Sequence, residues 1–177
     1  SDTHPDIDVV LNEMAPNDQL EALREQRIDI SISRQSVDDD LLYSRLLWPD
    51  PLLVALPPGH SLARREKLTL AELAHERFIM LRRETSHFAD QVFMACAARG
   101  FQPNVVHSVA EVPAQLSLVM AGLGIALVPT STRGLKPEAL AFCTLDEPDI
   151  QAHVHAIVRK NHKKAAIDTF LALLQAR

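Results

Sequence analysis

The chain has 177 residues, of which 47% are hydrophobic, and a net charge of -5 with its 18 lysines and arginines scattered along the sequence. This composition predicts a globular protein of one or two compact domains, and it provides no electrostatic footprint for a nucleic-acid surface. Cys96 and Cys143 lack a CxxC motif and a histidine at ligand spacing, so neither a disulfide framework nor a zinc site is expected.

No membrane or export role is expected from the sequence. The longest apolar run, residues 117–129, is too short and too interrupted by glycine to span a bilayer. The residues after Ser1 include neither a basic start nor an apolar signal region. We therefore expect a protein of the reducing cytoplasm.

The first third of the chain predicts a β-α-β unit. The β-branched stretches at residues 7–13 and 28–33 are typical of strands, and the segment between them places Leu20 and Leu23 on one helical face. The usual form of this unit has parallel strands joined by a right-handed crossover.

The middle and last parts of the chain continue the alternation of strands and helices. An extended stretch at residues 41–60 contains Pro49 and Pro51, which indicate an edge, a bend or a change of sheet. Further strands are predicted at residues 78–81, 104–109, 125–129, 140–145 and 152–159, and helices at residues 70–74, 86–99, 111–122 and 165–176. This alternation predicts an α/β fold with largely parallel sheets.

Two glycines, Gly122 and Gly124, interrupt the apolar run SLVMAGLGIALVP. Gly122 can take the left-handed conformation that ends a helix, and Gly124 lets the chain turn within two residues. The sequence IALV then enters the sheet as a strand that is buried on both faces. The glycines are thus predicted to form a tight joint from helix to strand, in the reverse order of a dinucleotide-binding fingerprint.

Several separate blocks of the sequence occur in the order found in one family. They are HPDIDVVLNE, LEALREQRIDISI, PPGHSLA, AARGFQP, the glycine joint and the terminal FLALL. In these blocks the chain resembles the effector-binding domain of LysR-type transcriptional regulators, from about His4 to the last helix. The NEM sequence and the arginine after IDISIS are similar to those of regulators of aromatic-compound breakdown.

The resemblance implies an α/β fold with two Rossmann-like subdomains joined by crossover strands, periplasmic-binding-protein-like (type 2), with the effector in the cleft. We expect regulatory subdomain I at residues 1–51 plus 152–177 and regulatory subdomain II at residues 52–151. Family members have a strand and helix of about 25 to 30 residues, the length of one strand and its crossover helix, before the HPDID block. We expect this first strand and helix, and the N-terminal DNA-binding domain, to be missing from this chain.

Ligands of open α/β sheets bind beyond the carboxyl ends of the strands, where helix N-termini aim N–H groups outward. The candidate effector contacts are therefore residues that follow predicted strands: Pro16, Arg34, Arg82, Arg83, Thr85, Ser86, Val112 and Pro129. Arg34 can bind a carboxylate through both arms of its guanidinium. The alternative for Arg34 is a structural salt bridge with Asp38 or Asp39.

The loop RRETSH has two interpretations. Thr85 and Ser86 can cap the following helix, and a capping hydroxyl beside free N–H groups can also hold an anion. Arg82 and Arg83 would raise the local positive potential, and only one of the two is expected to point inward.

The two apolar candidates carry weaker signals. Val112 is expected either as an apolar wall of the site or as packing at the start of its helix. Pro16 stands where relatives in the aromatic-catabolism branch place a hydroxyl residue, which weakens the transfer of their effector to this chain.

Catalytic and metal-binding motifs are not found in the sequence. His153 and His155 share one face of a predicted strand without a carboxylate motif nearby, and Cys143 has no base beside it in sequence. No P-loop, GxGxxG or zinc motif is present. We expect no enzyme activity, no metal and no cofactor.

The sequence therefore predicts a sensor module that binds a small anionic metabolite, a carboxylate, and controls the conformation of a DNA-bound oligomer and transcription. By resemblance, its partners are a second copy or three further copies of the chain, promoter DNA through the N-terminal domain, and RNA polymerase as a candidate. Two alternatives remain open: a free solute-binding receptor, marked by an export signal upstream, and a small-molecule enzyme of the same fold, marked by turnover of its ligand.

Overall fold

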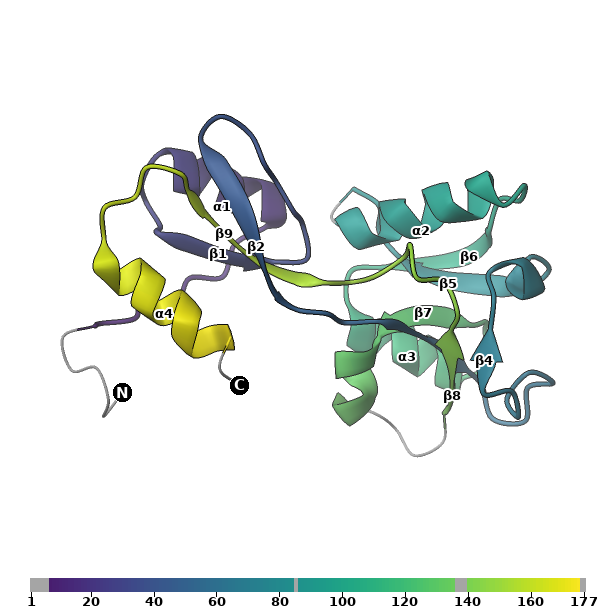
Figure 1. The fold of residues 1–177 in the computed structure, drawn as a ribbon. Helices are drawn as coiled ribbons and strands as arrows, with labels where there is room; N and C mark the ends of the chain where they lie inside the picture. Colours follow the sequence, from purple (N-terminus) through teal and green to yellow (C-terminus); the bar gives the residue numbers. More distant parts are fainter. Residues whose placement is uncertain (1–6, 85, 136–139, 176–177) are drawn as a thin grey trace. The chain divides into compact units, whose positions relative to one another are not determined.

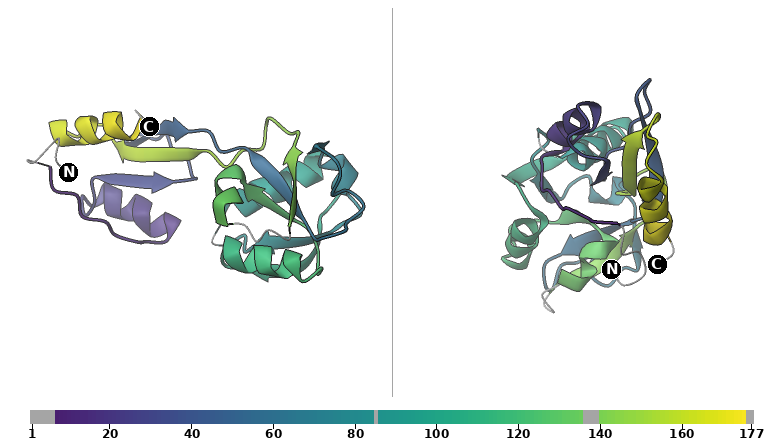
Figure 2. Two further views of the ribbon diagram at one scale, coloured as in Figure 1. Left: turned by 90° about the horizontal axis from the view of Figure 1, so that it is seen from below. Right: turned by 90° about the vertical axis from the view of Figure 1, so that its left-hand side faces the viewer.

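The computed structural model describes residues 7–84, 86–135 and 140–175. The chain divides into two compact units (Figures 1 and 2). Unit 1 comprises Ser1–Trp48 with Val154–Arg177, and unit 2 comprises Pro49–His153. Among the described helices, none has the length and apolar character needed to cross a membrane.

Unit 2 contains the larger set of elements. Its strands are β3 (Leu52–Leu56), β4 (Lys67–Leu68), β5 (Arg77–Leu81), β6 (Asn104–Val109), β7 (Ala126–Pro129) and β8 (Ala141–Leu145). Its helices are the 3-10 helix η1 (Ala71–Leu73), α2 (His87–Ala98), α3 (Val112–Met120) and the 3-10 helix η2 (Thr130–Leu135).

The strands of unit 2 run in mixed directions. The order is β4-β8-β3-β7, with β3 antiparallel to both neighbours and β4 parallel to β8, and β5 pairs with β6 in parallel. Two backbone hydrogen bonds, from Ile79 N to Ile125 O and from Ile125 N to Arg77 O, both 2.8 Å, join β5 to the residue before β7. The expectation of largely parallel sheets is therefore wrong for this sheet. Its strand β3, which follows the connection after β2, runs antiparallel to both β7 and β8.

Helices cover both faces of these strands (Figure 1). Phe78 and Met80 of β5 belong to the buried cluster that contains the inner face of α2. Ile79 faces the other way and packs with Leu116 and Val119 of α3. Because both faces are covered, β3 and β7 are buried along their whole length, as parallel-sheet strands commonly are.

The glycine joint forms between α3 and β7, as predicted, but its two glycines have different reasons. Gly122 follows the end of α3 with a φ of 76°, a conformation that favours glycine. Gly124 is required by close approach, since a Cβ there would lie 2.5 Å from the carbonyl oxygen of Arg77. Gly124 thus lets β5 come near the chain before β7, rather than providing a turn.

Unit 1 contains a smaller, antiparallel sheet. Its elements are α1 (Pro16–Arg24), β1 (Ile30–Ser33), β2 (Leu42–Trp48), β9 (Val154–Arg159) and α4 (Ala165–Gln175). The strand order is β1-β9-β2, and both pairings are antiparallel. The central strand β9 alternates its side chains: Ala156 and Val158 pack toward α4, and Ile157 packs with Leu23 of α1.

The predicted strand at residues 7–13 is not formed in the structure. This segment is extended coil (Figure 2), and the side chains of Val10 and Leu11 are 74% and 86% exposed. Within the described residues, no strand pairs with it, so its β-branched sequence has no hydrogen-bonding partner. The predicted parallel β-α-β unit is consequently replaced by the antiparallel pairing of β1 with β9.

A groove of about 400 Å³ lies in unit 1. Its walls are the extended segment at residues 7–14, the chain entering and forming β1, and the first residues of α4. The groove thus lies along β1.

Candidate functional site

The loop after β5 begins beside the entry to α3. The backbone N–H of Arg82 donates to the carbonyl of Val109 at 2.9 Å, which extends the pairing of β5 with β6 by one residue. Two segments chosen from the sequence as candidate site residues, the RRETSH loop and the chain leading into Val112, therefore start from one end of the same two strands.

Ser86 caps α2, as the sequence predicts. Its Oγ accepts a hydrogen bond from the backbone N–H of Ala89 at 3.2 Å. The remaining N–H groups of the first turn have no partner within the helix, and the helix dipole adds positive potential there. This end of α2 suits an anion or a hydrogen-bond acceptor. Thr85, the other capping candidate, lies outside the described residues.

The side chains of both arginines of the loop are exposed. Arg83 donates from Nε to the carboxylate of Asp90 at 3.0 Å, and its guanidinium carbon lies 4.1 Å from the centre of the Phe93 ring. These contacts hold Arg83 against its own helix.

The apolar candidates of unit 2 belong to its packing. Val112 begins α3 and packs, partly buried, against the cluster formed by Ile79, Leu116 and their neighbours. Pro129 is the last residue of β7 and is buried opposite Leu52 of β3.

The two remaining candidates belong to unit 1. Arg34 follows the last residue of β1 and is half-buried. The acidic residues proposed as its structural partners each pair with another cation: Asp38 with Lys160 at 2.8 Å and Asp39 with Arg24 at 2.6 Å. Pro16 is the first residue of α1, where the fixed φ of proline suits the helix start.

The structure reveals a buried glutamine that the sequence analysis missed. Gln115 lies in α3 and is only 2% exposed, and its Nε2 donates to the carbonyl of Ile79 at 2.7 Å. Its position provides a signal in the sequence, because Gln115 stands three residues after Val112 and one before Leu116, on the apolar stripe of the helix.

A second missed residue is Asp50, which is 3% exposed at the start of unit 2. Its carboxylate accepts hydrogen bonds from the backbone N–H of Ser131 at 3.0 Å and from the Ser131 hydroxyl at 2.6 Å. Its backbone carbonyl accepts from the N–H of Ala152 at 3.0 Å. Asp50 therefore ties together η2 and the two chain segments that connect the units.

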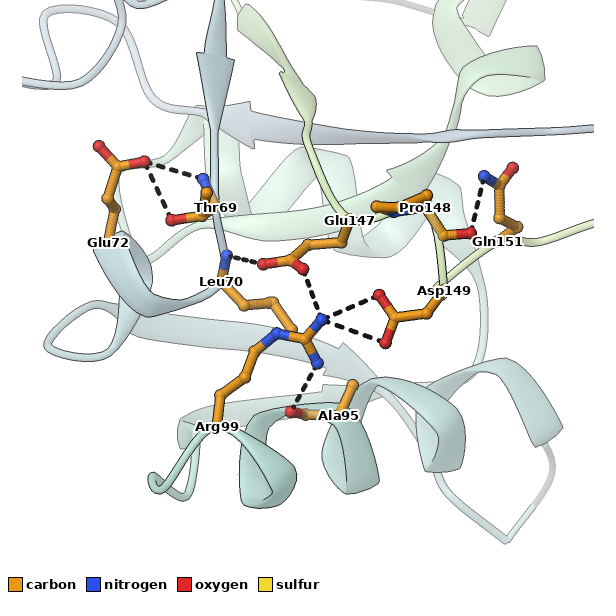
Figure 3. Close-up of polar contacts among 9 residues, drawn as sticks. All are labelled: Thr69, Leu70, Glu72, Ala95, Arg99, Glu147, Pro148, Asp149 and Gln151. Carbon is orange, nitrogen blue, oxygen red and sulfur yellow. Dashed lines mark hydrogen bonds and ion pairs between the residues drawn. The ribbon is translucent and has the colours of Figure 1, made fainter.

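An ion-pair cluster anchors the connection after β8 (Figure 3). Glu147 accepts hydrogen bonds from the guanidinium of Arg99 and, at 2.8 Å, from the backbone N–H of Leu70. Arg99 also pairs with Asp149 at 2.9 Å. The hydrogen bond to Glu147 raises the pKa of Arg99, so the guanidinium remains charged at neutral pH.

The described residues offer no nucleophile at neutral pH among the cysteines. Burial raises the pKa of Cys96 to about 11 and also raises the pKa of Cys143, so both remain thiols. Among the described residues, no group of three or more histidine, cysteine, aspartate or glutamate side chains is arranged to hold a metal ion.

Comparison with known proteins identifies the family. The family model for the LysR substrate binding domain matches residues 1–177. The chain is 37% identical over 129 residues to the HTH-type transcriptional regulator CatR of Pseudomonas putida, covering 72% of this chain and 44% of CatR. It is 30% identical over 167 residues to the HTH-type transcriptional regulator BenM of Acinetobacter baylyi, covering 93% of this chain and 55% of BenM.

Solved structures agree with this result. The BenM effector-binding domain with its effector benzoate superposes with a TM-score of 0.88 at 28% identity, over 99% of this chain and 80% of that one. Its fold class, with two periplasmic-binding-protein-like α/β subdomains, confirms the predicted one. The chain spans about half the length of the curated relatives that it matches. The chain belongs to the LysR substrate binding domain family.

Proposed function

We propose that this chain is the sensor of a transcriptional regulator and that its effector is a small carboxylate. The observation that carries the proposal is the similarity, over 99% of the chain, to the effector-binding domain of BenM, whose effector is benzoate. Effector binding would act by its different affinity for two arrangements of the protein, without any chemical conversion of the effector.

We propose Arg34, in unit 1, and the loop after β5, in unit 2, as candidate effector contacts. An arginine provides paired donors for a carboxylate, and the capped N-terminus of α2 provides further N–H groups. Within the loop we propose Arg82 for its charge and Ser86 for its place at the capped N-terminus of α2.

The same proposal covers the partners of the whole protein. The regulator would act as a homodimer or homotetramer in the cytoplasm, bind promoter DNA through a domain before this chain and influence RNA polymerase there. Full-length relatives of this kind are described as HTH-type transcriptional regulators.

We further propose that the groove of unit 1 receives the strand and helix that the family places before the HPDID block. Residues 7–13 have the sequence of a strand but no pairing partner among the described residues, and they form one wall of the groove. The chain also covers only 80% of the BenM effector-binding domain, which leaves room for such a segment.

Thermal unfolding with a panel of small carboxylates tests the proposed function. An effector at a hundredfold excess over its dissociation constant should stabilise the protein by about 2.7 kcal/mol through mass action. Benzoate is one probe, and benzamide, which has a similar shape but no charge, is its control. The absence of any stabilising carboxylate would contradict the proposal, and a ligand recovered chemically changed would favour an enzyme.

Substitution then assigns the arginines. Arg34→Ala should abolish most of the stabilisation by the effector. Arg65→Ala is the matched control, because Arg65 is an exposed arginine that forms an ion pair with Glu72 at 2.8 Å. An unchanged shift in Arg34→Ala would remove Arg34 from the site.

A further inference from the structure

Gln115 presents a buried hydrogen-bond acceptor that no described residue pairs with. The residue is 2% exposed, and its Nε2 donates to the carbonyl of Ile79 at 2.7 Å, but its Oε1 is buried and accepts no hydrogen bond from the part of the chain that the structure describes. A buried polar atom that loses its hydrogen bonds to water without replacement costs free energy, so native proteins rarely leave one unpaired.

The orientation of this amide is fixed by its other hydrogen bond. If the amide were flipped, Oε1 would face the carbonyl oxygen of Ile79, and two acceptors would meet at hydrogen-bonding distance. The acceptor is therefore directed away from Ile79, the carbonyl that its nitrogen binds.

Gln115 lines a small cavity inside unit 2. The cavity has about 10 Å³ of space, and its other lining residues are apolar side chains of β5 and α2 together with Leu127. The space suits a single oxygen atom. A water molecule is held well only by two to four polar partners, and among the described residues that line this cavity Gln115 is the sole polar one. A ligand hydroxyl, whose remaining atoms are bound elsewhere in the site, would therefore satisfy the Gln115 acceptor better than an isolated water molecule.

The cavity lies beside the candidate effector residues. Phe88 and Ala89, which line it, belong to the first turn of α2, which Ser86 caps through the N–H of Ala89. Leu81, another lining residue, directly precedes Arg82. Gln115 of α3 and the first turn of α2 thus line one cavity beside β5.

We propose that Oε1 of Gln115 accepts a hydrogen bond from a hydroxyl of the effector and selects hydroxylated carboxylates over their unsubstituted analogues. This inference rests on the proposed function, since the carboxylate itself would be held by the loop after β5. A site with an acceptor that only a hydroxylated ligand satisfies disfavours the ligand that lacks the hydroxyl, because that ligand leaves the acceptor unpaired.

Binding of four matched probes by isothermal titration calorimetry tests the inference on the unmodified protein. The probes are benzoate and its 2-, 3- and 4-hydroxy derivatives, which share a carboxylate and a ring. At least one hydroxybenzoate should bind about tenfold more tightly than benzoate, the effect of one well-formed hydrogen bond. If benzoate binds as tightly as all three hydroxybenzoates, the inference is overturned.

The variant Gln115→Met separates Gln115 from the rest of the site. Methionine fills a similar volume without an acceptor, so the preference for the hydroxybenzoate over benzoate should disappear. Gln91→Met, at an exposed glutamine of α2, is the control and should retain the preference. A preference that survives Gln115→Met would overturn the assignment.

A second measurement serves if Gln115→Met does not fold. In a crystal structure of the unmodified protein with the preferred hydroxybenzoate, the ligand hydroxyl should lie within hydrogen-bonding distance of Gln115 Oε1. A water at this position with every probe would overturn the inference and leave the proposed function intact. Failure of all four probes to bind would count against both this inference and an aromatic carboxylate effector, whereas the carboxylate panel tests the wider class.

Discussion

Unit 2 and unit 1 differ in how completely their strands are paired and covered. In unit 2, β3 and β7 are buried along their length, and α2 and α3 pack on opposite faces of the strands. In unit 1, β1 pairs only with β9 among the described strands, and the extended segment before α1 exposes Val10 and Leu11. A β-branched segment thus forms a strand only where a neighbouring strand supplies hydrogen bonds.

The largest expected difference in stability comes from substituting alanine for one leucine in each unit. Leu52→Ala in β3 should lower the free energy of unfolding by about 2 to 5 kcal/mol, because a buried leucine leaves a cavity. Leu11→Ala should change it by less than about 0.5 kcal/mol, because the side chain is exposed. Urea unfolding followed by circular dichroism measures both.

Equal losses for the two variants would contradict the comparison. A longer product that includes the strand and helix proposed to precede this chain would sharpen it. If the groove of unit 1 receives that proposed strand, Leu11→Ala should become costly in the longer product and remain neutral in this chain.

The next effect concerns the close approach of β5 to the chain before β7. Gly124→Ala should destabilise unit 2 by about 1 to 3 kcal/mol, because its Cβ would meet the backbone carbonyl of Arg77, which has little room to move. Gly134→Ala is the control, since no atom lies within 4 Å of the Cβ position there. A Gly124→Ala variant as stable as the Gly134→Ala variant in thermal unfolding would show that the strands are not so close.

The ion-pair cluster of unit 2 should contribute a smaller amount. Glu147→Ala leaves the N–H of Leu70 without its acceptor and Arg99 without its best-buried partner, at a cost of about 1 to 2 kcal/mol. Asp149→Asn should have little effect, because Asp149 is 60% exposed and exposed ion pairs contribute little. Denaturant midpoints of the two variants measure the difference, and the reverse order would contradict the role of Glu147.

The smallest effect is a pH dependence in unit 1. The backbone N–H groups of Leu42 and Leu41 and the guanidinium of Arg24 lower the pKa of Asp39 to about 2. A carboxylate whose folded pKa is lowered stabilises the fold above its unfolded pKa, near 3.9, and this contribution is lost as pH falls toward the folded value. The urea midpoint of Asp39→Asn should therefore lie below that of the unmodified protein at pH 7.

The difference between the two midpoints should shrink between pH 4 and pH 2, since Asp39 takes up its proton over that range. A difference that stays constant across these pH values would assign the effect of Asp39 to its shape rather than its charge.

Local signals predicted much of the fold. The cap at Ser86 and the left-handed Gly122 depend on nearby residues, and the sequence places both of them correctly. The strand directions depend on distant partners: β9, far along the chain, inserts between β1 and β2 and makes unit 1 antiparallel. The local sequence patterns of β1 and β2 carry no information about the insertion of β9 between them.

The candidate site was predictable only in part. The rule that ligands bind beyond strand ends located the loop after β5 and the start of α3, which the structure brings to one end of β5 and β6. Gln115 was not predicted, because glutamine is mostly a surface residue and its place on the apolar stripe of α3 is a weak signal of burial. Arg83 was chosen for its charge, but its contacts with Asp90 and Phe93 depend on the geometry of α2.

The central claim is that this chain binds a small carboxylate at the candidate effector residues, and amide NMR spectra recorded during titration with the most stabilising carboxylate test it most directly. The account predicts saturable shift changes at Arg34 and its neighbours and at Arg82 to Ser86. Saturable changes confined to residues outside these two groups, or no saturable change at all, would contradict it.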